Sequence, residues 1–409
     1  MKRIYRIFLV LLSVVVLSWF LPWLYSLLFP VGVNYPFVGY SPVSDSFIVS
    51  DNTPDSGLRI FETDSTGRLL RDGIDKNERD SLLPQVYFTQ LAAREKLPDS
   101  IAGKEVTIPA LKHGQWVYSS LPRDINKVSA DVYLMMESMP VRFELEDPKV
   151  VFRMDNGLEF VDIATNTVDE GKSQRFTDLF AKRGFAYPAR SMNADITSRK
   201  PYDEGYLMVD ANGDVFNVKM QAGRPYMMKV PNPDRIDAAH VFIMENVDRR
   251  QLGLMVDRNN DLYVIEREGY RVKPLPVGKV NPETDKVTIM ANMFNWIVKV
   301  ENGDGAVWSA IDADDYSLLG RYELKRPVSV SEKVASYLFP YELSFTEITD
   351  CYAYPRVGGV SFSAIYLNVL LSVILLIAGR RKRRHGYAGA VITLVFGIYS
   401  FIPLILIKD

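Results

Sequence analysis

Three long apolar stretches without a charge, each next to basic residues, constrain this chain more than any other feature. They cover residues 7–30, 360–379 and 386–407. A helix needs about 20 apolar residues to cross the hydrocarbon layer, so each stretch is long enough to span a membrane. The flanking cations are Lys2, Arg3, Arg6, Arg380, Arg381, Lys382, Arg383 and Arg384.

The first stretch has a rival interpretation as a cleaved secretory signal. Such a signal has a shorter apolar core of about 7–15 residues and a cleavage site made of small residues. Here the stretch contains Trp19, Trp23 and Tyr25 instead, residue types that favour the outer headgroup boundary of a membrane. We therefore interpret residues 1–30 as an uncleaved signal anchor.

The cation clusters predict the orientation, because cytoplasmic loops collect Lys and Arg. Both clusters are cytoplasmic if the first helix runs outward, the second inward and the third outward, which leaves Lys408 outside. Residues 31–359 then form one extracytoplasmic domain, and residues 360–409 form a transmembrane hairpin with a basic cytoplasmic loop at 380–385. We expect a bacterial inner membrane. Contact of the basic loop with anionic lipid or nucleic acid is the alternative explanation of the cluster.

Small and polar residues recur at spacing four in the two C-terminal stretches, as in helices that pack closely in lipid. The hairpin helices packing on each other would explain the pattern, and so would docking to another membrane subunit. The residues are Ala364, Asn368, Ser372, Gly389, Thr393 and Gly397.

The large middle segment is acidic. Nine of the 48 basic residues and one of the 50 acidic residues lie outside residues 31–359, which leaves this segment a net charge of −10. A nucleic-acid-binding domain needs a basic surface, so this class is disfavoured. With Cys351 as the only cysteine, the domain has no internal disulfide.

Short apolar runs separated by Asn, Gly and Asp turns recur through this segment, as in β-hairpins. The turn asparagines Asn156, Asn212, Asn259 and Asn302 are 56, 47 and 43 residues apart. Such periods are typical of β-propeller blades. We predict a mainly β, propeller-like domain, with tandem β-sandwiches as the alternative; residues 47–69 resemble an earlier blade and residues 342–354 a late strand pair.

One segment departs from this pattern. Asp75 with Glu78 forms a plausible capping box, and apolar residues then recur every four positions, which predicts a helical insertion over residues 75–96. Pro84 should bend this helix or delay its start. It could dock a partner or cap an open end of the core.

The search for chemistry gives little. Asp257, Asn259 and Asp261 match the first positions of a calcium loop, as do Asp210, Asn212 and Asp214, but Leu262 and Val215 replace the required glycine. Asx turns explain both segments without a metal. The three histidines, His113, His240 and His385, lack metal-ligand spacing, and no nucleotide-binding or hydrolase motif is present. We expect no cofactor.

Three segments carry a resemblance to a known family. Residues 82–103 (LLPQVYFTQLAAREKLPDSIAG), 161–173 (VDIATNTVDEGKS) and 200–210 (KPYDEGYLMVD), with the basic C-terminal hairpin, resemble a family of uncharacterised bacterial envelope proteins with a domain of unknown function. The resemblance implies genes beside ABC-type transporter subunits, and hence an accessory role. It supplies no catalytic residue and no ligand.

Together these features predict a membrane-anchored extracytoplasmic binding or scaffold protein whose partners are lipid and other membrane subunits, such as an ABC-type transporter. We do not expect an enzyme. An envelope hydrolase that uses Asp or Glu residues of the β domain is the alternative, because carboxylate pairs have no fixed spacing. A sensor that signals through the hairpin is a third hypothesis, disfavoured because no cytoplasmic output domain follows.

Overall fold

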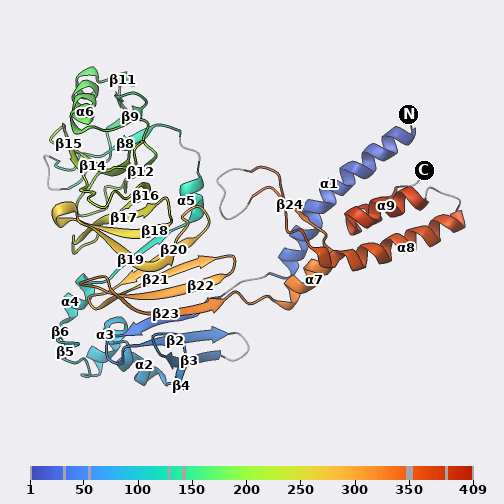
Figure 1. The fold of residues 1–409 in the computed structure, drawn as a ribbon, viewed down its shortest axis with the longest axis horizontal. Helices are drawn as coiled ribbons and strands as arrows, with labels where there is room; N and C mark the ends of the chain where they lie inside the picture. The colour runs from blue at the N-terminus through green and yellow to red at the C-terminus, as the bar shows by residue number, and fades with distance from the viewer. Residues whose placement is uncertain are drawn as a thin grey trace. The chain divides into compact units, whose positions relative to one another are not determined.

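The structure is a computed structural model that describes residues 2–30, 34–53, 57–127, 130–140, 144–346, 353–382 and 386–407. It divides into two compact units (Figure 1). The β unit comprises residues 35–325, and the helical unit comprises residues 1–34 and 326–409. Residues 326–359, which the sequence analysis assigned to the extracytoplasmic domain, thus belong to the same unit as the apolar helices.

Antiparallel sheets dominate the β unit, so the prediction of a mainly β domain is confirmed. In four of the five larger sheets the strands lie side by side in chain order, and the fifth gains one strand from elsewhere in the chain. The first sheet contains β1 (Phe37–Ser41), β2 (Ser46–Thr53), β3 (Gly57–Thr63) and β4 (Leu69–Asp72). The second contains β8 (Tyr133–Met135), β9 (Val150–Met154), β10 (Leu158–Asp162) and β11 (Thr167–Val168).

The other three sheets follow in the chain. The third contains β12 (Ser191–Asn193), β13 (Tyr206–Val209), β14 (Val215–Gln221) and β15 (Arg224–Lys229). The fourth contains β16 (Ala238–Ile243), β17 (Gln251–Asp257), β18 (Asp261–Glu266) and β19 (Val272–Lys279). The fifth contains β20 (Lys286–Ala291), β21 (Asn295–Asn302), β22 (Gly305–Asp312), β23 (Leu318–Lys325) and, paired with β20, β7 (Trp116–Ser120).

All four predicted hairpins are present, as β9–β10, β13–β14, β17–β18 and β21–β22. Their turns use the expected residues. Gly213 has φ +84° and Asn260 has φ +65°, a left-handed conformation that glycine and asparagine tolerate better than other residues.

Apolar residues on both faces of the strands decide how the sheets pack. In β13, Tyr206 and Met208 face the second sheet, whereas Leu207 and Val209 face the fourth, because neighbouring side chains point to opposite faces. The fourth and fifth sheets also bury both faces. Figure 1 shows the resulting row of first, fifth, fourth, third and second sheets. Separate two-sheet sandwiches would leave one face of each sheet open, so the blade-like arrangement describes the unit better.

The predicted insertion at residues 75–96 is helical and interrupted, as Pro84 indicated. It contains α2 (Lys76–Leu82) and α3 (Pro84–Ala93), and the Asp75 carboxylate caps α2 by accepting from the backbone N–H groups of Asn77 and Glu78. Leu83 packs with Ile48 and Ile60, so the helices cover the free face of the first sheet.

Short elements complete the β unit, and α6 covers the second and third sheets through Phe176 and Phe180. They are β5 (Ser100–Ile101), β6 (Lys104–Glu105), α4 (Ile108–His113), α5 (Pro122–Asn126), α6 (Glu170–Arg183) and η1 (Glu268–Tyr270).

The helical unit is built around a cluster that includes Val14, Phe339 and Tyr399. Its elements are α1 (Lys2–Leu28), α7 (Val330–Leu338), β24 (Glu342–Ser344), β25 (Arg356–Gly358), η2 (Phe362–Ala364), α8 (Ile365–Lys382), α9 (Gly386–Phe396) and α10 (Ile398–Leu406). The predicted late strand pair is present, with its second strand shifted to Arg356–Gly358.

Among the described residues, one helix is long and apolar enough to cross a membrane, Ile4–Leu28, and Phe362–Ala378 and Tyr387–Phe396 are shorter apolar helices. The expectation of one continuous third helix over residues 386–407 is wrong. Gly397 has φ +53° and separates α9 from α10. Helix α10 then returns along α9: Ser400 Oγ lies 3.3 Å from Thr393 Oγ1, and a Cβ at Gly389 would lie 3.6 Å from Leu404.

Candidate functional site

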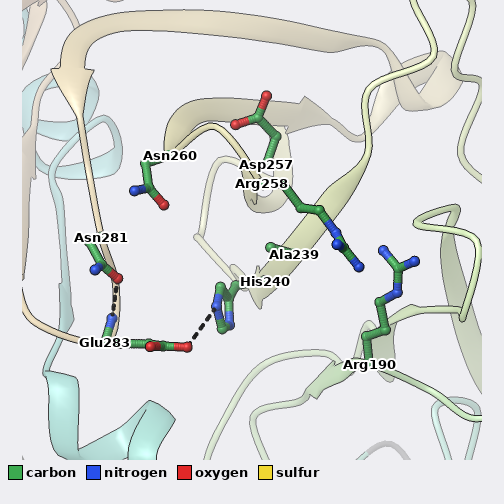
Figure 2. A pocket seen from close by; sticks show the side chains of 8 residues that line it. All are labelled: Arg190, Ala239, His240, Asp257, Arg258, Asn260, Asn281 and Glu283. Carbon is green, nitrogen blue, oxygen red and sulfur yellow. Dashed lines mark hydrogen bonds and ion pairs between the residues drawn. The ribbon is translucent and has the colours of Figure 1, made fainter.

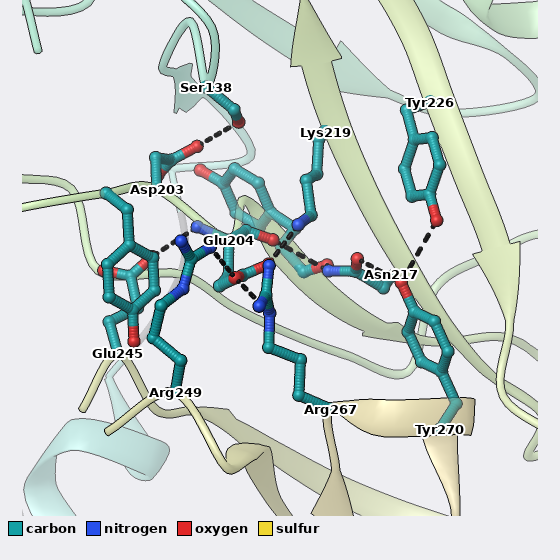
Figure 3. A network of polar contacts seen from close by, with 12 residues as sticks. Ser138, Asp203, Glu204, Asn217, Lys219, Tyr226, Glu245, Arg249, Arg267 and Tyr270 are labelled. Carbon is teal, nitrogen blue, oxygen red and sulfur yellow. Dashed lines mark hydrogen bonds and ion pairs between the residues drawn. The ribbon is translucent and has the colours of Figure 1, made fainter. Parts of the chain in front are cut away.

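The most unusual feature of the β unit is a set of charged side chains buried between its sheets (Figure 3). Its centre is Glu204, which precedes β13 and is 1% exposed. Lys219 on β14 bonds one carboxylate oxygen. The other oxygen lies 3.0 Å from Nη2 of Arg249, which precedes β17, and 2.8 Å from Nε of Arg267, which follows β18. One carboxylate therefore joins the third sheet to the fourth.

A second part of the network is built around Lys200. Its Nζ lies 2.7 Å from Asp203 Oδ1 and 2.6 Å from Glu245 Oε2. Glu245 also accepts a bond of 2.6 Å from the backbone N–H of Glu204, and Ser138 bonds Asp203. The network thus reaches residues beside the second, third and fourth sheets.

Burial and pairing act in opposite directions on these carboxyl groups. For Glu204, burial favours the neutral acid, but the hydrogen bond and charge of Lys219, with the two arginines, outweigh burial and lower its pKa. For Glu245, burial dominates over the bonds from Glu204 and Lys200 and raises its pKa to about 7. Glu245 therefore titrates near neutral pH, while Glu204 stays ionised.

Aromatic side chains surround the network on the third and fourth sheets. The Arg249 guanidinium lies 3.9 Å from the ring centre of Tyr202, a cation–π contact. Tyr270 donates to Asn217 Oδ1 over 3.2 Å, and its hydroxyl lies 3.2 Å from that of Tyr226. Because each carboxylate already holds cations or backbone donors, the arrangement is chemically suited to fixing the sheets in place.

A separate polar cleft of about 440 Å³ opens beside the fourth sheet (Figure 2). His240 on β16 lies in it, with its Nε2 3.9 Å from Glu283 Oε1. Burial lowers the pKa of His240, and the nearby Glu283 only partly opposes this effect. The imidazole is therefore neutral at pH 7 and can accept a proton. The cleft is lined by Arg190, Ala239, His240, Asp257, Arg258, Asn260, Asn281 and Glu283.

Two arginines form one side of this cleft. Arg190 Nη1 and Arg258 Nε lie 2.6 Å and 3.1 Å from the two carboxylate oxygens of Asp237. Figure 2 shows both guanidinium groups on the side of His240 away from Glu283. Opposite charges thus flank the imidazole.

The two calcium-like segments are Asx turns in the structure. Asp257 Oδ1 accepts from the backbone N–H groups of Asn259 and Asp261 over 2.9 Å and 2.8 Å. Asp210 Oδ1 holds its own turn in the same way, with two bonds of 2.9 Å. No group of three or more His, Cys, Asp or Glu side chains within the described ranges could hold a metal ion.

The six residues singled out for helix packing come together inside the helical unit. Ser372 Oγ donates to Ala390 O over 3.0 Å, and Asn368 Nδ2 donates to Leu394 O over 3.2 Å, so α8 is bonded to α9. A Cβ at Gly397 would lie 2.2 Å from Asn368 Oδ1, which explains the glycine. Ala364 and Thr393 are fully buried, and Gly389 faces Leu404.

The predicted topogenic cations lie at the helix ends, as far as they are described. Lys2 and Arg3 begin α1, Arg6 is half-buried one turn later, and α8 ends with Arg380, Arg381 and Lys382. Arg383, Arg384, Cys351 and Lys408 lie outside the described residues.

Sequence reasoning missed the buried network and the cleft. One signal was present: Lys200, Asp203 and Glu204 stand together beside Tyr202 and directly before the fully buried strand β13. Charges that lead into a buried strand need partners. Their partners Lys219, Arg249 and Arg267 lie too far along the chain for spacing to reveal them.

Comparison with known proteins gives a family and distant structural similarity. The family model "Domain of unknown function (DUF4857)" matches residues 37–311. No curated protein matches the chain. The chain is similar to the β-propeller domain of Cps50 (Swd1) from Myceliophteria thermophila, with 13% identity and a TM-score of 0.27, over 55% of this chain and 62% of that one.

Two other structural comparisons extend further along this chain but are no stronger. Dihydro-heme d1 dehydrogenase NirN gives 11% identity and a TM-score of 0.27 over 74% of this chain and 60% of that one. Apo AztD from Citrobacter koseri gives 9% identity and a TM-score of 0.27 over 76% of this chain and 78% of that one. The chain spans less than two thirds of Cps50 and of NirN, and similarity at this level says nothing about function. The family match, in contrast, covers most of the chain, which therefore belongs to the DUF4857 family, a family defined by a domain of unknown function.

Proposed function

We propose that this protein is a membrane-anchored extracytoplasmic binding or scaffold protein, an accessory subunit of a membrane complex such as an ABC-type transporter. The observation that carries the proposal is the inside-out polarity of the helical unit. Its interior holds Asn368, Ser372 and Thr393, each less than 10% exposed, whereas Leu11 and Leu370 are 59% and 56% exposed. Lipid is the solvent that suits such a surface.

The membrane arrangement follows from the same helices. We propose that α1 runs outward from a cytoplasmic N-terminus in the bacterial inner membrane and that α8 returns, which places the acidic β unit outside. At about 1.5 Å per residue, α9 is about 16 Å long and too short to cross a hydrocarbon layer of about 30 Å. Because α10 returns along α9, this hairpin enters and leaves on the cytoplasmic side.

Cysteine labelling in intact cells tests this topology on a Cys351→Ala background. A cysteine at Lys382 should resist a membrane-impermeant thiol reagent, and so should one at Lys408, because α10 leads back towards the basic loop. A cysteine at Gly303, in a tight turn of the β unit, should react. Labelling at Lys408 with protection at Lys382 would restore the continuous third span, and labelling at Lys382 would refute the orientation.

The accessory role is supported by the way the β unit uses its buried charges. Glu204 holds Arg249 and Arg267 from beside the fourth sheet, and Glu245, which follows β16, holds Lys200 and the backbone N–H of Glu204. These contacts give a rigid body suited to presenting a surface. Capture of the detergent-solubilised full chain and identification of the co-purified chains would test the role. Transporter permease or ATPase subunits would support it, whereas a chain that purifies alone at native expression levels would argue against it.

A second candidate function, an envelope hydrolase, is favoured by one observation. His240 is neutral and lies beside Glu283 in the polar cleft, an arrangement from which a base could activate water. Turnover of an ester, amide or glycoside substrate that is lost in His240→Gln, with unchanged melting temperature, would support it. Unchanged turnover in that variant would exclude the cleft as its site.

A further inference from the structure

The short helix α7 of the helical unit is apolar on two sides. Ser329 caps it by bonding the backbone N–H of Glu332, and the Glu332 side chain bonds the N–H of Ser329 in return. Val330, Val334 and Tyr337 are 78%, 44% and 51% exposed. They stand at positions i, i+4 and i+7, so they form one outward stripe.

The opposite side of α7 already has its partners. Ala335 and Leu338 pack into the cluster that contains Tyr25 and Tyr399, and the ring of Phe339, which follows α7, lies 5.6 Å from that of Tyr25. The outward stripe is therefore a second apolar surface rather than the core face of the helix.

Contacts fix the level of α7 along the proposed membrane spans. Tyr25, close to the outer end of α1, donates to Ser331 O over 3.0 Å. Ser361, just before α8, donates to Ser336 O over 2.7 Å, and the rings of Tyr337 and Tyr366 are 6.3 Å apart. In Figure 1, α7 lies where the end of α1 meets the start of α8.

Aromatic side chains collect at this level, as they do at a membrane boundary. Phe362 is 89% exposed and Tyr366 is 72% exposed at the start of the second span. Trp19 and Trp23, 39% and 49% exposed, stack 6.2 Å apart on α1. The outward stripe of α7 meets one of these side chains, because Tyr337 lies beside Tyr366.

We propose that α7 is an interfacial helix that lies on the outer leaflet, with Val330, Val334 and Tyr337 in the boundary between headgroups and acyl chains. This rests on the proposed membrane anchoring. Lys333 is exposed beside the stripe and can reach the headgroups, and Glu332 is already paired with Arg326. The occupant of the stripe is thus phospholipid, and α7 lies at a fixed depth in the outer leaflet.

Quenching by brominated lipid tests this placement in the full chain. On the Cys351→Ala background, a small environment-sensitive fluorophore is attached to cysteine at Val334, and the protein is reconstituted into vesicles of phosphatidylcholine and phosphatidylglycerol. Lipids brominated high on the acyl chain should remove most of the fluorescence, and lipids brominated near the chain end should remove less. Val330→Cys gives an independent position on the same stripe if the first variant folds poorly.

Two control positions separate this inference from the proposal on which it rests. Ser336→Cys, on the other side of α7, should lose little fluorescence with either lipid. Val16→Cys on α1 should be quenched most by the deeply brominated lipid. Quenching at Val16 without quenching at Val334 and Val330 would overturn the interfacial helix alone, and would mean that protein or water covers the stripe. An absence of quenching at Val16 would overturn the membrane anchoring as well.

Discussion

Replacing Glu204 by Gln tests whether the buried network holds the third and fourth sheets together. The change keeps the shape of the side chain but removes the carboxylate that pairs with Lys219, Arg249 and Arg267. The two arginine side chains are 41% and 40% exposed, so water screens most of their uncompensated charge. The Lys219 side chain is only 10% exposed and carries most of the penalty.

Breaking a buried ion pair from one side costs about 3–5 kcal/mol. Because one of the three cations is buried and two are screened, we expect a loss near the lower end of that range, about 3 kcal/mol, for Glu204→Gln. Lys219→Met should cost less, because Glu204 keeps both arginines. The double variant should be more stable than the sum of the two losses indicates, since replacing Lys219 removes the buried charge that Glu204→Gln alone leaves without a partner.

Thermal unfolding of the detergent-solubilised chain, followed by the β-structure signal, provides the measurement. At an unfolding entropy of about 2.1 cal/mol/K per residue, a loss of about 3 kcal/mol lowers the melting temperature of a unit that spans residues 35–325 by about 5 °C. The folded state lowers the pKa of Glu204, so its contribution is present above the unfolded pKa and is lost as the pH falls through the folded pKa. The difference between parent and variant should therefore shrink in acid. Equal melting temperatures at pH 7 would refute a stabilising role for the network.

Three further outcomes are expected. Because burial raises the pKa of Glu245 to about 7, the neutral acid stabilises the fold fully below the unfolded pKa of about 4.3, and this stabilisation is lost as the pH rises towards 7. Glu245→Gln should flatten the resulting decline of the melting temperature with pH, and an unchanged pH profile would contradict this prediction. Gly397→Ala should destabilise the helical unit by about 2 kcal/mol in a detergent melt, because a Cβ would meet Asn368 Oδ1 at 2.2 Å and φ is +53°, whereas Gly389→Ala should have little effect. Millimolar calcium should leave the melting temperature unchanged relative to chelator, because the Asp257 carboxylate already accepts hydrogen bonds from the backbone of its own turn. A calcium ion bound at a hundred times its Kd would raise the free energy of unfolding by about 2.7 kcal/mol. A rise in melting temperature that disappears in Asp257→Ala would therefore reveal a calcium site.

The network shows why part of the candidate site could not be derived from the sequence. The segment around Lys200 and Glu204 entered the sequence analysis only through the family resemblance, although its charges directly before the strand β13 were a readable sign that partners are needed. The identity of the partners was not readable, because Arg249 lies 45 residues further along and reaches Glu204 only when the fourth sheet packs on the third. Many other acidic and basic residues of the chain could serve as partners if residue type alone decided the pairing.

The same distinction applies to the C-terminal apolar helices. Residues 386–407 have the length and composition of one span, and Gly397 matched a small residue at a packing position. Glycine permits the positive φ of residue 397 but does not require it. The contacts of Asn368, Thr393 and Ser400, which form when α10 returns along α9, decide this conformation.

By itself, the sequence determined the features that depend on residues close together in the chain. Asn and Gly turns between apolar runs gave the four hairpins, Asp75 and Pro84 gave an interrupted helix, and residues 4–28 gave an apolar helix long enough to span a membrane. Only the tertiary structure decided which sheets are neighbours, and that β7 joins β20 through pairs such as Ser120 with Val287. Turn chemistry and periodicity act over a few residues, whereas these pairings depend on the total surface buried when distant segments meet, which no local pattern records.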